Sequence, residues 1–139
     1  MQPLLKQSGF SLIEILVTVL LLSIGLLGLT ALQLNGLKQN QNALQLTNST
    51  FFAYEIADRM RANRADALAG RYVIAFDATA QTGTLYGDEL VNWKNNLAAQ
   101  LPSGDGRITV AGDVYSITIR WDDSKGLAPL VEYQVETQL

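Results

Sequence analysis

One carboxylate stands at the start of a long apolar stretch, and its chemistry needs an explanation. Glu14 is followed over residues 15–32 by side chains that carry no charge. A charged carboxylate at the centre of a bilayer costs about 2.5–3.5 kcal/mol on insertion scales, so such groups usually have a partner. Glu14 therefore either pairs with a cation or lies at the level of the lipid headgroups, where water solvates it.

The other side chains give little indication of catalysis. The chain has no histidine and no cysteine, which removes the commonest metal ligand, the usual acid–base group near neutral pH, and thiol chemistry. Asp105, Asp113, Asp122 and Asp123 fall where turns are expected and lack the spacing of a calcium loop. No glycine-rich phosphate loop, dinucleotide fingerprint or nucleophile–base pair occurs. We therefore predict that the protein is not an enzyme and holds no cofactor and no metal.

The distribution of charge argues against direct binding of nucleic acid. The whole chain has a formal net charge of −3, and its C-terminal half, residues 71–139, carries five basic and nine acidic side chains. A nucleic-acid footprint needs basic residues clustered on one face. We expect no nucleic-acid partner for this part of the chain.

The apolar stretch predicts a helix that spans a membrane. Residues 15–32 are long enough to cross the hydrocarbon core. Lys6, the one basic residue before the stretch, fits a cytoplasmic N-terminus. Residues 28–32, where the stretch ends, match the small-residue cleavage pattern of a secretory signal peptide poorly. Gly25 and Gly28 within it fit either close packing against another helix or local loosening of this one.

The helix is predicted to continue beyond the membrane to about residue 67, because no proline occurs from position 4 to position 101. Apolar side chains recur along one side at intervals of seven and of four, at Leu37, Leu44, Phe51, Phe52, Ile56 and Met60. Gly70 is a plausible end of this helix. We expect the apolar side between Leu37 and Met60 to pack against a globular head.

The remaining residues predict a small α+β head. Residues 71–76 read as a short strand, and Asp88 as the cap of a short helix. The apolar side of that helix consists of Leu90, Trp93, Leu97 and Leu101, and we expect Trp93 to lie in the core. Residues 106–110, 114–121 and 131–135 alternate as the strands of an antiparallel meander, with a hairpin turn at residues 111–113. One face of the meander should pack on the long helix.

Residues 9–14, which read GFSLIE, together with the apolar run resemble the class III signal of type IV pilins and the related pseudopilins. In that family a membrane-embedded aspartyl peptidase cuts after the glycine and methylates the new N-terminal residue. The resemblance implies cleavage between Gly9 and Phe10 and N-methylation of Phe10. It also implies that Glu14, the fifth residue after the cut, pairs with the new N-terminal amine of its own chain or of a neighbouring subunit during assembly.

A second segment narrows the resemblance. Residues 58–64, which read DRMRANR, and Tyr54 before them resemble the end of the long helix in PilV-type minor pilins. The resemblance makes Arg59, Arg61 and Arg64 candidate interface residues. The same mixed charges also fit an ordinary solvated helix face. A contact with another subunit and a tie to the acidic head of the same chain are both open.

Together, these resemblances imply a pilin-like α+β fold in which one long N-terminal helix packs on an antiparallel sheet of three to four strands. The expected parts are a leader at residues 1–9, a transmembrane or filament-core helix at 10–34, its amphipathic continuation at 35–69 and the head at 70–139. Major pilins usually close a C-terminal loop with a disulfide, and the absence of cysteine here agrees with a minor subunit.

The implied function is that of a minor pilin, which helps to prime or assemble the type IV pilus and so serves twitching motility, adhesion and DNA uptake. The alternatives are a minor pseudopilin of a type II secretion system and a membrane-tethered adhesin or sensor domain that never polymerises. The implied partners are the prepilin peptidase, other minor pilins and the major pilin, the inner-membrane assembly platform, and membrane lipid before assembly. The implied location is the bacterial inner membrane, with the head in the periplasm, and afterwards the pilus at the cell surface.

Overall fold

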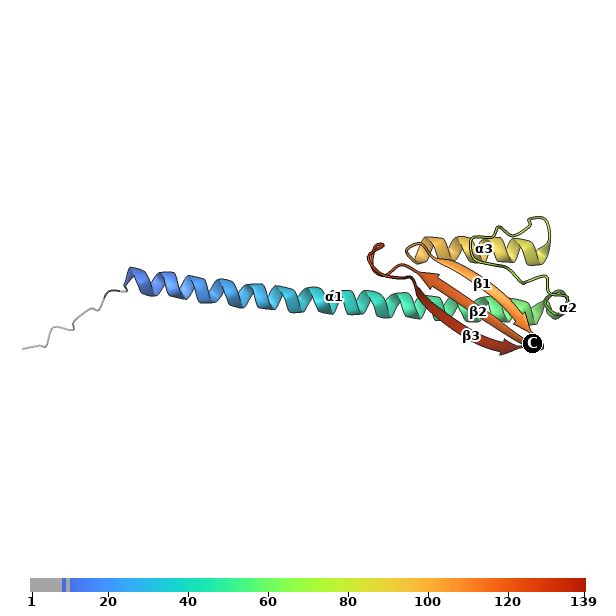
Figure 1. Ribbon diagram of the computed structural model, residues 1–139, viewed down its shortest axis with the longest axis horizontal. Helices are drawn as coiled ribbons and strands as arrows, with labels where there is room; N and C mark the ends of the chain where they lie inside the picture. The colour runs from blue at the N-terminus through green and yellow to red at the C-terminus, as the bar shows by residue number, and fades with distance from the viewer. Residues whose placement is uncertain (1–8, 10) are drawn as a thin grey trace, which may run out of the picture. The chain divides into compact units, whose positions relative to one another are not determined.

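The computed structural model describes residue 9 and residues 11–139, and shows an α+β chain (Figure 1). The elements in chain order are α1 (Leu12–Ala62), α2 (Arg64–Leu68), α3 (Leu85–Gln100), β1 (Asp105–Ala111), β2 (Val114–Trp121) and β3 (Val131–Gln138). The chain divides into two compact units, Met1–Asn40 and Gln41–Leu139. The expected class is confirmed, because one long N-terminal helix packs on a three-stranded antiparallel sheet.

The described part of the first unit is the apolar portion of α1, and it lies uncovered. Every residue from 12 to 40 is exposed. An 18-residue window of this helix has a mean hydropathy of 2.6, and none of it is buried. By length and composition, α1 is therefore able to cross a membrane.

In the second unit, residues 41–62 of α1 form one wall of the head's core. The buried residues on this part of α1 are Gln45, Ser49, Phe52, Ala53, Ile56, Ala57 and Met60. The buried side of α1 therefore follows the interval of four residues that joins Phe52, Ile56 and Met60. Leu37, Leu44 and Phe51 are 65%, 61% and 64% exposed, so the expectation that they also pack against the head is wrong.

The helix was expected to run unbroken to about residue 67, and it does not. α1 ends at Ala62, Asn63 leaves the helical conformation with φ −107° and ψ 47°, and α2 follows. The side-chain amide of Asn63 donates to the Tyr72 hydroxyl at 3.0 Å and to the Glu89 carboxylate at 3.2 Å. These long-range hydrogen bonds compensate for the interruption. Gly70, with φ +73°, ends the helical region where it was predicted to end.

The helix of the head begins earlier than predicted. Thr84, not Asp88, caps α3, because the Thr84 hydroxyl oxygen accepts a hydrogen bond from the Gly87 amide at 3.3 Å. The Asp88 carboxylate accepts instead from the Gly83 amide at 3.0 Å. Trp93 is in the core as expected, and its indole donates to the Phe52 carbonyl oxygen of α1 at 3.0 Å.

The strand predicted at residues 71–76 is absent, since this segment makes only one bridge, between Ile74 and Ile108. The ammonium group of Lys94 donates hydrogen bonds to carbonyl oxygens that follow this bridge along the chain, to that of Ala75 at 2.9 Å and to that of Ala78 at 2.8 Å. Asp77 then turns the chain with φ +58°. A side chain from α3 thus takes carbonyl oxygens that a longer strand would use for pairing.

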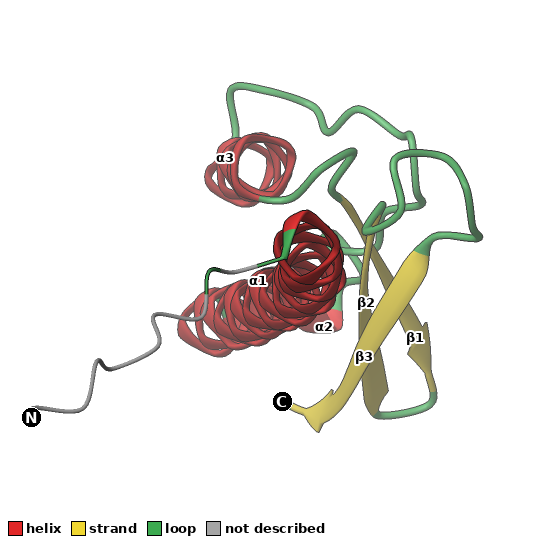
Figure 2. Cartoon of the chain, turned by 90° about the vertical axis from the view of Figure 1, so that its left-hand side faces the viewer, coloured by secondary structure: helices red, strands yellow, loops and turns green. Residues whose placement is uncertain are grey.

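The meander is confirmed, with the strand order β1-β2-β3 and antiparallel pairing throughout. A two-residue turn joins β1 to β2, and Gly112 at its first position has φ +61°. The inner face of β2 is at most 3% exposed and consists of Tyr115, Ile117, Ile119 and Trp121. Figure 2, which looks along α1, shows the sheet on one side of this helix and α3 on another.

Candidate functional site

The expected processing site lies just before α1, and only part of it is described. Gly9 is exposed, and a Cβ atom built on it would meet nothing within 4 Å. Nothing in the packing of the described residues therefore requires glycine at position 9. Phe10 and the leader residues 1–8 lie outside the described residues, so cleavage and methylation stay predictions.

Glu14 lies in the first turn of α1 with an exposed side chain. One turn later, the Thr18 hydroxyl donates to the backbone carbonyl oxygen of Glu14 at 2.6 Å and so does not serve its carboxylate. A carboxylate near a helix N-terminus is favoured by the helix dipole. The first turn of a helix also leaves amide groups free, and the exposed Glu14 carboxylate can still bind a partner from elsewhere.

The hydroxyl groups farther along the apolar run bond within their own helix. Ser23 donates to the Val19 carbonyl oxygen at 2.7 Å, and Thr30 donates to that of Leu26 at 2.9 Å. Such bonds remove the cost of placing a hydroxyl in lipid. This part of α1 is thus adapted to an apolar environment along its length.

One side of this helix combines the carboxylate with small residues. At 3.6 residues per turn, Thr18, Gly25 and Gly28 fall on the same side as Glu14. A Cβ atom at either glycine would meet nothing within 4 Å. Space therefore exists here for the close approach of a second helix, while local loosening at the glycines stays an alternative.

Two of the three candidate arginines contact the end of β3 or the residue that follows it. Arg61 donates to the Thr137 hydroxyl at 2.6 Å and pairs with Asp58 at 2.7 Å. Arg64 donates to the backbone carbonyl oxygen of Leu139 at 3.0 Å. These contacts join the end of α1 and the start of α2 to the end of β3. Both contacts are therefore within the chain. Their acceptors are a hydroxyl and a carbonyl oxygen, and not the acidic side chains of the head that the sequence had suggested.

The third arginine makes a different contact. Arg59 pairs with Glu55 at 2.5 Å on the surface of α1, one helical turn apart. Both side chains border the exposed Phe51 and Tyr54. The interface role of Arg59, Arg61 and Arg64 stays a prediction.

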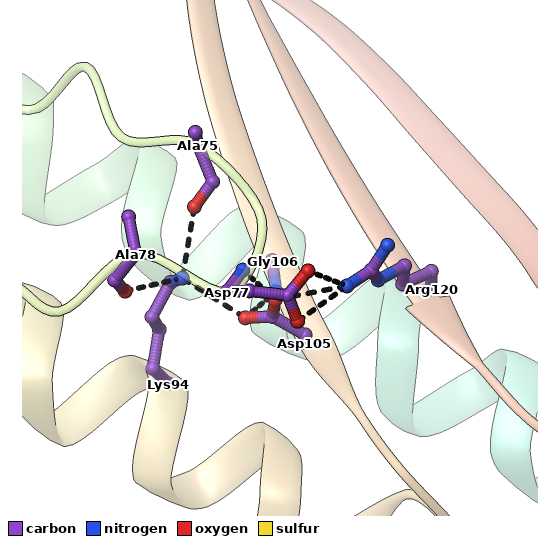
Figure 3. A network of polar contacts seen from close by, with 7 residues as sticks. All are labelled: Ala75, Asp77, Ala78, Lys94, Asp105, Gly106 and Arg120. Carbon is purple, nitrogen blue, oxygen red and sulfur yellow. Dashed lines mark hydrogen bonds and ion pairs between the residues drawn. The ribbon is translucent and has the colours of Figure 1, made fainter.

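A network of ion pairs, which the sequence did not reveal, fixes the segment before α3. Figure 3 shows Lys94 and Arg120 on either side of Asp105. Lys94 pairs with Asp105 at 3.0 Å, and Arg120 donates to both carboxylate oxygens of Asp77 at 2.7 Å. Asp105 is the first residue of β1 and not the turn residue that was expected. The sequence signal was present only as separate charges, distant along the chain.

The environment of Asp105 makes it a structural carboxylate. Burial alone would raise its pKa, but hydrogen bonds from the Asp77 amide at 2.6 Å, the Lys94 side chain and the Gly106 amide at 2.8 Å together hold the pKa below its ordinary value. Such a group stays ionised near neutral pH, so it is unsuited to proton transfer there.

A second polar cluster that the sequence did not reveal surrounds Tyr72. Burial, together with the hydrogen bond that the Tyr72 hydroxyl donates to Glu89, raises the pKa of Tyr72 to about 12. The cluster joins the end of α1 to α3 through Asn63. It stabilises the fold and offers no activated nucleophile.

The remaining aspartates of interest lie in connections between strands. Asp113 lies in the β1–β2 turn, and Asp122 accepts hydrogen bonds from the amide and hydroxyl of Ser124. The bond from the Ser124 amide is the main reason that the pKa of Asp122 is lowered. Within residue 9 and residues 11–139, no group of three or more acidic side chains is arranged to hold a metal ion.

The comparisons with known proteins agree with the N-terminal resemblance. Residues 4–30 match a family model described as the prokaryotic N-terminal methylation motif. This class III signal supports a type IV pilin-like protein, either a pilin or a pseudopilin, which is a structural subunit and not a class of enzyme. It implies processing by a prepilin peptidase, assembly with other pilins, and anchoring in a membrane before that assembly. No curated protein and no solved structure matched the chain.

Proposed function

We propose that the chain is a minor pilin, a structural subunit that helps to prime or assemble a type IV pilus. The observation that carries the proposal is the uncovered apolar portion of α1 behind a methylation motif. A helix this apolar needs lipid, or the helices of neighbouring subunits, to cover it. The inner membrane supplies the first environment and the filament core the second.

In this proposal the peptidase cuts between Gly9 and Phe10, and the new amine of Phe10 becomes the partner of Glu14 in a neighbouring subunit. The side of α1 that carries Glu14 also carries Thr18 and two glycines, so another helix can approach closely. Desolvation by that helix strengthens a charge pair. Helix packing and the charge pair then act together to hold the subunit in place.

The finer assignment depends on less evidence. The likeness of residues 58–64 and Tyr54 to PilV-type minor pilins favours a minor subunit, as does the absence of cysteine. Twitching motility, adhesion and DNA uptake would then follow from its part in the pilus. The head would face the periplasm before assembly and the cell surface afterwards.

The test is the mature N-terminus, measured by mass spectrometry in cells with and without the prepilin peptidase. We expect a chain that begins at N-methylated Phe10 only in cells that have the enzyme. Gly9→Val is a matched control, because a Cβ atom at position 9 meets nothing within 4 Å among the described residues, so the head should fold unchanged. A chain still uncut in cells that have the peptidase would favour a tethered adhesin or sensor that never polymerises.

A pseudopilin of a type II secretion system has the same signal and helix. Deletion of the gene separates the two functions. A minor pilin predicts loss of surface pili with normal secretion, and the chain itself should occur in sheared, purified pili. Normal piliation together with a secretion defect would instead assign the chain to the secretion system.

A further inference from the structure

The outer edge of β3 is open. β3 is eight residues long and pairs with β2 on one side. On its other side, no backbone-to-backbone hydrogen bond reaches residues 131–138 from the part of the chain that the structure describes. Figure 1 shows β3 at the margin of the sheet, beside β2. An edge of this length is a template for another strand unless something blocks it.

The inner face of the sheet is also incomplete at this edge. The inward side chains of the central strand β2 are at most 3% exposed. Those of β3, from Val131, Tyr133 and Val135, are only partly buried. The apolar side chains of the sheet therefore become more exposed toward β3. A further strand beside β3 would cover them.

A groove beside the start of this edge is partly apolar. Leu46 of α1 and Val131 help to line it, and its volume is about 230 Å³. Leu46 is 48% exposed, although it lies within the head unit. At the other end of β3, Arg61 contacts Thr137. A strand laid beside the start of β3 would cover Leu46.

The outer face of the edge is acidic. Glu132, Gln134 and Glu136 point away from α1 and are exposed, and β3 contains no basic residue. Cross-strand neighbours of opposite charge stabilise a sheet, and like charges destabilise it. A strand that pairs with β3 therefore meets carboxylates on its outer face and apolar side chains on its inner face.

We propose that the β3 edge binds an extended segment of another protein chain, in which apolar and basic side chains alternate. Backbone pairing supplies the affinity, and the alternation supplies the specificity. A second copy of this chain fits poorly, because two β3 edges in antiparallel pairing bring Glu132 and Glu136 of both copies together. The proposal does not depend on the chain entering a pilus.

The test uses the full chain in a non-ionic detergent and synthetic eight-residue peptides. One peptide alternates valine with lysine, and its matched control alternates valine with glutamate. We expect the lysine peptide to slow amide hydrogen exchange at residues 131–138 and to bind about tenfold more tightly than the glutamate peptide. Equal binding of the two peptides, or protection confined to other segments, would overturn the proposal.

Two controls separate strand pairing from general attraction of charge. Glu136→Lys should weaken binding of the lysine peptide by about fivefold. Asp113→Lys, the same charge change in the β1–β2 turn, should leave that binding unchanged. A lysine peptide with alternate backbone amides N-methylated should lose the protection of β3, because it cannot complete the pairing. Equal losses for the two variants, or full binding by the methylated peptide, would show that no strand is added.

Discussion

At the scale of single residues, Glu14 differs from the other polar side chains of the apolar run in how it can be satisfied. The hydroxyls of Thr18, Ser23 and Thr30 donate to carbonyl oxygens of their own helix. An ionised carboxylate only accepts hydrogen bonds, and within its own helix only the free amides of the first turn could donate to it. When lipid or other helices surround this segment, a cationic donor from outside the helix would satisfy the Glu14 charge more fully.

Glu14→Ala should leave cleavage intact and weaken incorporation into pili, because the loss of a charge-assisted hydrogen bond costs about 1.5–3 kcal/mol. The ratio of this chain to the major subunit in sheared pili should fall by about tenfold or more. Glu14→Gln is the matched variant that removes the charge and keeps the shape of the side chain. Its ratio to the major subunit should fall nearly as far. Incorporation of Glu14→Ala at the wild-type ratio would contradict the pairing.

Gly106→Ala should destabilise the head, since the new methyl group would lie 2.2 Å from the Trp93 ring. Overpacking of this kind costs about 1–3 kcal/mol. The free energy of unfolding, followed by tryptophan fluorescence in urea, measures the effect. Gly36→Ala is the control, because its methyl group meets nothing within 4 Å, and it should leave unfolding of the head unchanged.

At the scale of elements, the segment between α2 and α3 is held by charges in place of strand pairing. Lys94 holds two of its carbonyl oxygens, and Arg120 holds the Asp77 carboxylate. Arg120 also lies over the Phe76 ring at 4.1 Å. Because Asp105 contacts both Lys94 and Arg120, it is the residue on which this arrangement depends.

The network predicts a pH dependence. The pKa of Asp105 in the folded state lies below its ordinary value of 3.8, so its carboxylate stabilises the fold above that pH. This stabilisation is lost as the pH falls through the folded-state pKa. Asp105→Asn should lower the free energy of unfolding by about 1–3 kcal/mol at pH 7, and the difference should shrink below pH 3.8.

Urea unfolding from pH 7 to pH 3 measures this difference. Asp113→Asn is the control, because Asp113 lies exposed in the β1–β2 turn. It should change the free energy of unfolding by less than about 0.5 kcal/mol. A difference between wild type and Asp105→Asn that stays constant over this range would contradict the assignment.

The arginine ties predict which end of β3 opens first. Arg61→Ala combined with Arg64→Ala should speed amide exchange at residues 137–139 and leave the core protected, because partly exposed contacts are worth about 0–1 kcal/mol. Arg59→Ala is the matched control, since Arg59 pairs with Glu55 in its own helix. Equal exchange in the two variants would show that these arginines do not hold β3.

At the scale of the whole molecule, the core and the apolar segment belong to different units. Every buried residue of the described chain lies at or beyond Gln45. Residues 12–40 are all exposed and add nothing to that core. Folding of the head and attachment to a membrane are therefore separate properties of this chain.

The fragment Gln41–Leu139 should fold without the first unit. Its melting temperature should agree with that of the full chain in detergent within about 4 °C, because no core contact is removed. Near-ultraviolet circular dichroism from Trp93 and Trp121, both buried in the head, gives the readout. A fragment that keeps helix but loses this signal would contradict the independence of the head.

The sequence by itself determined the features that depend on local periodicity. The uncharged run predicted a long helix, the interval from Phe52 to Met60 predicted its buried side, and the alternation from Tyr115 to Trp121 predicted the inner face of the sheet. Each is a repeat within one segment, so no knowledge of distant contacts is needed. The N-terminal motif was equally local, although the structure does not test the chemistry at Phe10.

Only the tertiary structure decided where these local patterns stop. Asn63 interrupts the helix because Tyr72 and Glu89 accept its hydrogen bonds. Residues 71–76 fail to form a strand because Lys94 on α3 takes neighbouring carbonyl oxygens. Such outcomes depend on side chains that are close in space and distant along the chain. Their free energies come from hydrogen bonds and ion pairs between distant parts of the chain, which no periodicity of the sequence reveals.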